Sequence, residues 1–94
     1  MYIGVPFRPV THQSVAYTGT AGAIANGVGT GINVIRVMMT TAGFIAIGRA
    51  PAAATTDVPM AANVPEYFLC EPGDKVSAIQ ASAGGNLHVT EMSR

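Results

Sequence analysis

Charge is the scarcest property of this sequence. Asp, Glu, Lys and Arg make up 11% of its 94 residues, against about 25% in an average soluble domain. The five basic residues are scattered along the chain, whereas phosphate binding needs clustered Lys and Arg. We therefore expect no direct nucleic-acid partner. The formal net charge of zero favours association over solubility, so the surface is either rich in Thr, Ser, Ala and Gly or covered in an oligomer or lattice.

Cysteine is nearly absent, which excludes an intrachain disulfide framework. The single cysteine, Cys70, ends the apolar run 67–70, where we expect a small buried hydrophobe. The first eight residues lack the basic and apolar regions of a signal peptide. Polar residues and glycines interrupt the uncharged stretch 9–35, so no membrane span or membrane partner is expected.

Catalytic motifs are also missing. The glycines of residues 27–31 match neither the dinucleotide fingerprint nor the phosphate-binding P-loop. His12 and His88 lie far apart, and a zinc site would need Asp57 or Cys70 to converge on them through folding. No serine stands in a nucleophile elbow. We therefore expect a protein that is not an enzyme, with no catalytic residue, cofactor or metal site.

What the sequence does contain is β structure. In residues 34–39, Ile35, Val37 and Met39 alternate with Arg36, and β-branched residues are frequent. A short turn containing Gly43 follows and leads into residues 44–48. This pattern is typical of a β-hairpin. In the last strand, Leu87 and Val89 should point to one side, and His88 and Thr90 to the other.

The full set of expected strands covers residues 14–20, 33–40, 43–48, 66–71, 75–81 and 86–92, and the glycine-rich residues 82–86 should join the last two as a hairpin. Short strands separated by turns predict an all-β fold, a small β-sandwich or jelly-roll-like barrel. Residues 14–94 form the single β domain. We expect these residues in its core: Val37, Ile45, Leu69, Ile79 and Val89.

Three connections carry glycine or proline signals. Pro72-Gly73-Asp74 predicts a type II turn with Gly73 at positive φ. The glycine-rich segment 19–31 is either a flexible surface loop or a close-packed segment where small residues let another backbone approach. Residues 49–65 contain three prolines, which block a long helix and leave a meandering connection with one short strand at most.

The N-terminal residues 1–13 form an extended arm or edge segment in this interpretation, because Pro6 and Pro9 disfavour a helix. The arm carries apolar side chains that we expect to extend beyond one small core. Its candidate partner-binding residues are Tyr2, Ile3, Val5 and Phe7.

Residues 33–93 resemble small virion proteins of tailed bacteriophages, which are head decoration (cement) or head–tail accessory proteins. The resemblance rests on a Val-rich strand in "IRVMMTTAGFIAIGRAPAAATTDVPM", a Gly-flanked "AIG" strand, an apolar strand, the Pro-Gly-Asp-Lys turn and a terminal Leu-x-Val-Thr-Glu strand. It implies a β-sandwich in the virion, assembled in the host cytoplasm, that binds the major capsid protein or other virion proteins. It also implies a homo-oligomer, often a trimer, with no cofactor.

Other functions stay open at this point. The chain could belong to a tail or to a knob that contacts the host surface. A carbohydrate-binding β-module would stack sugars on exposed aromatics, but the sequence has no Trp and three Tyr. A cupin-like enzyme would need a histidine cluster that the sequence does not supply.

Overall fold

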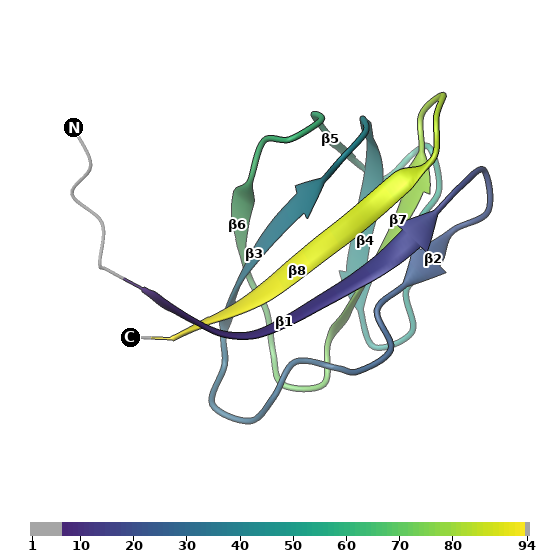
Figure 1. Cartoon of the computed structure of the whole chain (residues 1–94). Coiled ribbons are helices and arrows are strands. Elements are labelled where there is room, and N and C mark those ends of the chain that lie inside the picture. The colour runs from purple at the N-terminus through teal and green to yellow at the C-terminus, as the bar shows by residue number, and fades with distance from the viewer. Residues whose placement is uncertain (1–6, 94) are drawn as a thin grey trace.

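Two four-stranded antiparallel sheets pack face to face in the computed structural model, which describes residues 7–93 (Figure 1). The first sheet has the order β1 (Arg8–Tyr17), β8 (Gly85–Ser93), β3 (Val34–Met39) and β6 (Glu66–Leu69). The second sheet has the order β2 (Gly22–Ala23), β7 (Lys75–Gln80), β4 (Gly43–Gly48) and β5 (Val58–Met60). The predicted all-β sandwich is confirmed. Residues 7–93 form no helix that is long and apolar enough to cross a membrane.

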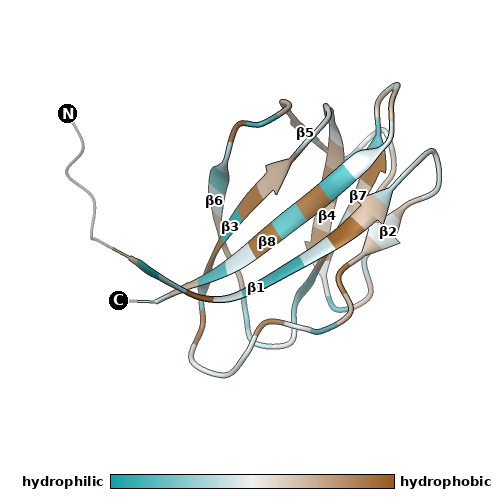
Figure 2. Cartoon of the chain, viewed as in Figure 1, coloured by the Kyte–Doolittle hydropathy of each residue, from teal (hydrophilic) through white to brown (hydrophobic). Residues whose placement is uncertain are grey.

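The core lies between the sheets and follows the predicted alternation. Ile35, Val37 and Met39 of β3 are fully buried. Leu87 and Val89 of β8 point into the same layer, and Figure 2 shows the resulting bands of apolar and polar residues along that strand. Burying alternate residues of both sheets in one layer is what holds a sandwich together. The predictions for Val37, Ile45 and Val89 are confirmed.

Two of the expected core residues lie elsewhere. Leu69 is 81% exposed: it pairs with Val34 on the outer face of the first sheet, while Phe68 points inward. Ile79 is only half-buried, because Val76 and Ala78 are the residues of β7 that fill the core. Leu69 stands in a run, residues 67–70, that is apolar in both strand phases, so alternation alone does not choose its phase. Ile79 shares its phase with Lys75 and Ser77, and the other phase supplies Val76 and Ala78 to the core.

Both expected hairpins are wrong. β3 pairs with β8 and β6, whereas β4 pairs with β7 and β5, so the connection after Met39 crosses from one sheet to the other. β7 and β8 likewise belong to different sheets. A strand that changes sheet has the same alternation as a strand that returns in a hairpin, because in both cases one face meets the core.

A buried tyrosine holds these two crossing connections together. The Tyr17 hydroxyl donates a hydrogen bond to the Thr41 carbonyl (2.7 Å) and accepts one from the Thr41 backbone N–H (3.1 Å). The Thr41 hydroxyl in turn donates to the carbonyl of Ala83 (2.8 Å). Tyr17 is 2% exposed, so its polar end needs such partners. The end of β1 therefore joins the connection after β3 to the connection before β8.

The glycine-rich segment 19–31 is packed closely, as the second of its two interpretations proposed. A Cβ atom at Gly22 would lie 2.3 Å from the Ala16 carbonyl oxygen, and one at Gly27 would lie 2.6 Å from the Gly73 carbonyl oxygen. Ile24 and Val28 from the same segment are buried in the core. Its small residues therefore permit backbone contact that side chains would prevent.

The Pro-Gly-Asp turn has the predicted geometry. Gly73 has φ +92°, and the Asp74 N–H donates to the Glu71 carbonyl (3.0 Å), which closes a type II turn. The expected short strand in the proline-containing connection is also present, as β5.

The first strand is longer than the sequence indicated. β1 begins at Arg8, where it pairs with Ser93, so residues 8–13 of the expected arm belong to the first sheet. Pro9 fits there because β1 is an edge strand, and the register shifts between Pro9 and His12. The strand expected at residues 14–20 also ends earlier, at Tyr17. The single domain includes the whole of β1.

Candidate binding face on the first sheet

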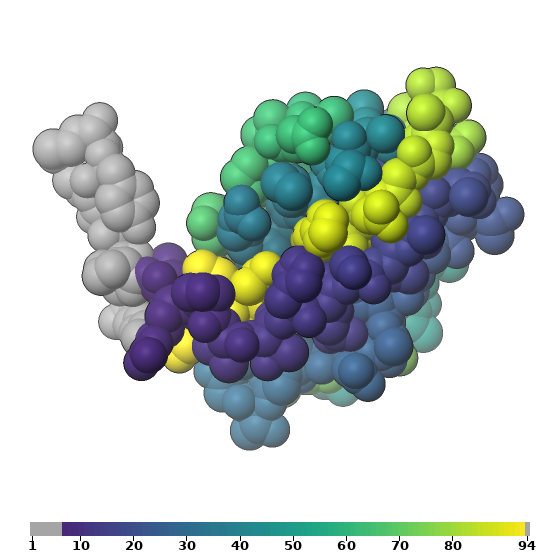
Figure 3. Space-filling model, in the orientation of Figure 1, coloured from purple at the N-terminus to yellow at the C-terminus, as the bar shows by residue number. Residues whose placement is uncertain are grey.

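The outer face of the first sheet carries two of the exposed large hydrophobic residues, Tyr67 and Leu69, and Figure 3 looks onto it. Its composition follows from the strand register. Tyr67 of β6 pairs with Arg36 of β3, which pairs with Thr90 of β8. One row further along, Leu69 pairs with Val34, which pairs with Met92. Residues directly opposite each other point to the same side of a sheet, so each row forms a continuous strip across three strands.

The second of these rows forms the floor of a groove. The groove has a volume of about 510 Å³ and is lined by Phe7, Gly31, Asn33, Val34, Leu69, Met92 and Ser93. Leu69 is the most exposed of the large hydrophobic residues among residues 7–93. A groove with a row of apolar side chains, one of them a highly exposed leucine, is typical of a surface that another molecule covers.

A smaller hollow of about 390 Å³ adjoins the groove, since Asn33 and Leu69 line both. Its other lining residues are Cys70, Glu71 and Asp74. The Cys70 thiol is buried, as the sequence predicted. Burial raises the pKa of this thiol, and the nearby carboxylates of Asp74 and Glu91 raise it further. Cys70 therefore stays protonated near neutral pH and is a poor nucleophile.

The edge strand β6 borders the groove. β6 is the last strand of the first sheet and pairs only with β3 among the described elements. Its outer edge therefore presents backbone N–H and C=O groups that no described strand engages. Such an edge is a template for strand addition by another chain. The side chains next to it, Tyr67 and Leu69, are both exposed.

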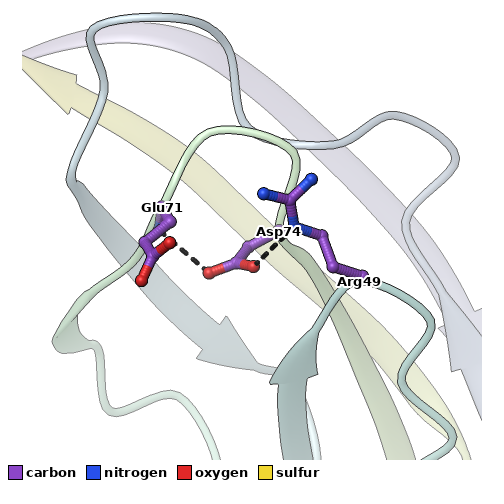
Figure 4. A network of polar contacts seen from close by, with 3 residues as sticks. All are labelled: Arg49, Glu71 and Asp74. Atoms are coloured by element: carbon purple, nitrogen blue, oxygen red, sulfur yellow. Dashed lines mark hydrogen bonds and ion pairs between the residues drawn. The ribbon is translucent and has the colours of Figure 1, made fainter.

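The charged groups near the groove serve the turn. Figure 4 shows the Asp74 carboxylate between Glu71 and Arg49. Asp74 Oδ2 accepts a hydrogen bond from the Glu71 backbone N–H (2.9 Å), and Asp74 Oδ1 lies 3.8 Å from Arg49 Nε. The Arg49 side chain is 72% exposed, so this ion pair contributes little to stability. The carboxylate therefore closes the turn.

Of the expected partner-binding residues, the structure describes one. Phe7 lies immediately before β1 and lines the groove. Tyr2, Ile3 and Val5 lie outside the described residues. Sequence reasoning placed Leu69 in the core and so missed it as the exposed centre of this face, and no signal in its apolar run distinguishes the two positions.

The two histidines also meet on this face, which the sequence did not suggest. His12 of β1 and His88 of β8 are neighbours because β1 pairs with β8. Their rings are 5.2 Å apart between centroids, at an interplanar angle of 20°. Only the register between the first and last strands could have shown this contact. Within residues 7–93, no group of three or more His, Cys, Asp or Glu side chains is placed to hold a metal ion.

No family model, curated protein or solved structure matches this chain.

Proposed function

We propose that this chain is a non-enzymatic structural protein of a bacteriophage virion, a capsid decoration or cement protein that binds and stabilises coat subunits. The observation that carries the proposal is the groove beside the open edge of β6, whose apolar row includes Leu69, a residue that is 81% exposed. Exposure of apolar side chains to water costs free energy, and binding a partner on this face removes that cost. With 11% charged residues, the chain has few charges to keep such a surface in water.

The binding mode follows from the two halves of this face. The outer edge of β6 offers backbone hydrogen bonds to a strand of a coat subunit. The groove offers an apolar contact in which Leu69 and Val34 are covered. Backbone pairing orients the partner, and burial of the apolar side chains provides affinity.

The expected arm directly precedes a residue of this face in the sequence. Phe7 lines the groove, and the apolar residues Tyr2, Ile3 and Val5 come before it in the chain. Together these four residues form the proposed contact with the major capsid protein, another virion protein or a second copy in a homo-oligomer. The resemblance of residues 33–93 to decoration and head–tail accessory proteins supports the same function.

The proposal predicts weak salt dependence. The groove lining contains no Asp, Glu, Lys or Arg, so association does not release the counterions that make phosphate binding steeply salt-dependent. Binding to purified particles should therefore change little between low and physiological ionic strength. A steep loss of binding with salt would show that charged groups dominate the contact.

Two variants test the face itself in particles purified from the host culture. Leu69→Asp places a charge at the groove and should greatly reduce the amount of the chain on particles. The matched control is Val58→Asp on β5 of the second sheet, because Val58 is 50% exposed but lies away from the groove. Equal incorporation of Leu69→Asp and wild type would show that this face is not the contact.

The arm is tested by deletion of residues 1–6, which leaves β1 and Phe7 in place. We expect a folded domain that incorporates less than the full chain. If the deletion variant incorporates into particles as well as wild type but Leu69→Asp does not, the groove binds the coat and the arm does not.

A further inference from the structure

The His12–His88 pair on the first sheet has the geometry of a metal site. The Nδ1 atom of His88 lies 3.2 Å from the Nε2 atom of His12. Two nitrogens that each lie about 2.0–2.1 Å from one ion, at an angle of about 100° between them, have this separation. The angle falls between the square-planar and tetrahedral arrangements that transition metals adopt.

A second hydrogen bond orients one of the two rings. The Nδ1 atom of His12 lies 3.0 Å from the Thr90 hydroxyl oxygen, and Thr90 is itself 9% exposed. When the His12 Nδ1–H donates to Thr90, the lone pair of Nε2 points toward His88. Metal-binding histidines are commonly held in this way, with the far ring nitrogen bonded to a second group.

A third donor stands beside the pair. Met38 of β3 pairs directly with His88 of β8, and residues directly opposite have Cβ atoms about 4.5–5.5 Å apart on the same face. Met38 is half-buried on that outer face, while its neighbours Val37 and Met39 fill the core. The face therefore brings two imidazoles into contact from adjacent strands, with Met38 opposite His88 on the third strand.

We propose that His12 and His88, with Met38 beside them, bind a copper(II) ion. Imidazole suits copper, nickel and zinc, and copper(II) has the highest affinity in the divalent series. No electron transfer is involved. The ion takes the place of the proton shared between the rings, and that proton moves to Nε2 of His88, so each imidazole stays neutral.

One neighbouring charge works against the ion. Arg36 pairs with Thr90 on the same face, and a guanidinium near a dication lowers its affinity. The proposal thus predicts that Arg36→Gln binds copper more tightly than wild type. A merely structural role for the histidine pair gives no reason for such a gain.

The site is independent of the proposed coat contact. The copper-binding residues occupy β1, β8 and β3 beyond the groove, whose lining does not include them. The chain could bind copper without being a virion component, or the reverse. Copper titration and particle incorporation therefore report on separate claims.

The test is a copper(II) titration of the ¹⁵N-labelled full chain, followed by NMR. Copper is paramagnetic, so its site appears as a local loss of amide signals, which we expect around His12 and His88. Nickel(II) and zinc(II) should bind more weakly at the same place. Loss of signals centred on Cys70 or on the N-terminal residues, with the histidine strands unchanged, would overturn the proposal.

Matched variants complete the test. His12→Gln and His88→Gln should each lower the copper affinity more than tenfold, while their spectra without copper remain those of a folded chain. Thr90→Val, which removes the partner of His12 but no ligand, should lower it about tenfold or more. Cys70→Ala is the control and should bind like wild type. Unchanged affinity in both histidine variants would refute the site.

Discussion

Four glycine-to-alanine variants separate the two reasons why this fold needs glycine. At Gly48, an added Cβ would meet nothing within 4 Å, and φ is not positive. At Gly31, the space is also open, but φ is +84°. At Gly27, φ is not positive, but the Cβ would lie 2.6 Å from the Gly73 carbonyl oxygen. Gly73 combines φ +92° with a Cβ position 2.6 Å from the Arg49 guanidinium.

The structure orders the costs of these variants. Gly48→Ala should be neutral or stabilise by up to about 1 kcal/mol, because alanine restricts the unfolded chain. A left-handed conformation costs a non-glycine residue about 1–2 kcal/mol, so Gly31→Ala should lose about 1 kcal/mol net. Gly73→Ala should lose about the same, because the exposed Arg49 side chain can move aside and its ion pair is worth little.

Gly27→Ala should be the most destabilising of the four. Its Cβ would push against backbone that two short hydrogen bonds hold in place, from the Gly73 N–H to the Val28 carbonyl (2.7 Å) and from the Val28 N–H to the Asp74 carbonyl (2.8 Å). Separating the two segments weakens both bonds, each worth about 0.5–1.5 kcal/mol, and adds strain. We expect a loss of about 2–4 kcal/mol.

Urea denaturation measures all four, with the free energy of unfolding taken from the midpoint and the m-value. The m-values should stay constant, since no variant changes the surface exposed on unfolding. The reasoning fails if Gly27→Ala is as stable as Gly48→Ala, because the glycine-rich segment then does not pack on the Pro-Gly-Asp turn. A Gly31→Ala variant as stable as Gly48→Ala would contradict the positive φ.

Three further predictions concern the core and the buried thiol. Val89→Asp should unfold the domain because it buries an unpaired charge. Leu69→Asp should keep the wild-type melting temperature, and a loss of melting temperature as large as that of Val89→Asp would refute the exposure assigned to Leu69. Tyr17→Phe should lower the free energy of unfolding, measured by urea denaturation, by about 1–3 kcal/mol, because the backbone N–H and carbonyl of Thr41 lose their partner. An unchanged free energy would mean that water replaces the hydroxyl. The raised pKa of Cys70 means that the folded state holds the thiol proton more tightly. This stabilisation is complete below the ordinary thiol pKa of 9.0 and is lost as pH rises through the folded-state pKa. The loss of stability between pH 8 and pH 10 should accordingly be smaller in Cys70→Ala, and parallel pH profiles would contradict the shift.

Alternation was enough to predict the fold class and the centre of the core. Val89 stands between His88 and Thr90, and Val37 follows Arg36, so one phase of each of these strands buries an unbroken apolar row. The turn at Gly73 could also be predicted, because Pro before Gly restricts the backbone to few geometries.

The pairing of the strands could not be predicted in the same way. Hairpin and sheet-crossing connections place the same residues toward the core, so the sequence around Gly43 fits both. The error at Leu69 has a related origin, since its run is apolar at every position.

The candidate sites depend on that missing information. The groove forms where Leu69, Val34 and Met92 line up across three strands, and the histidine pair forms where β1 meets β8. Contacts of this kind join residues that lie far apart in the chain, such as His12 and His88. They arise from register, which local sequence patterns do not encode.

The central claim, that this chain is a structural component of a virion, is tested most directly by quantitative mass spectrometry of purified particles. The copy number of the full-length chain is measured relative to the major coat protein, after washing at physiological ionic strength. The account predicts a reproducible copy number in a simple ratio to the coat subunits, and its loss with Leu69→Asp but not with Val58→Asp. Absence of the chain from particles, or trace amounts in no fixed ratio to the coat protein, would contradict it.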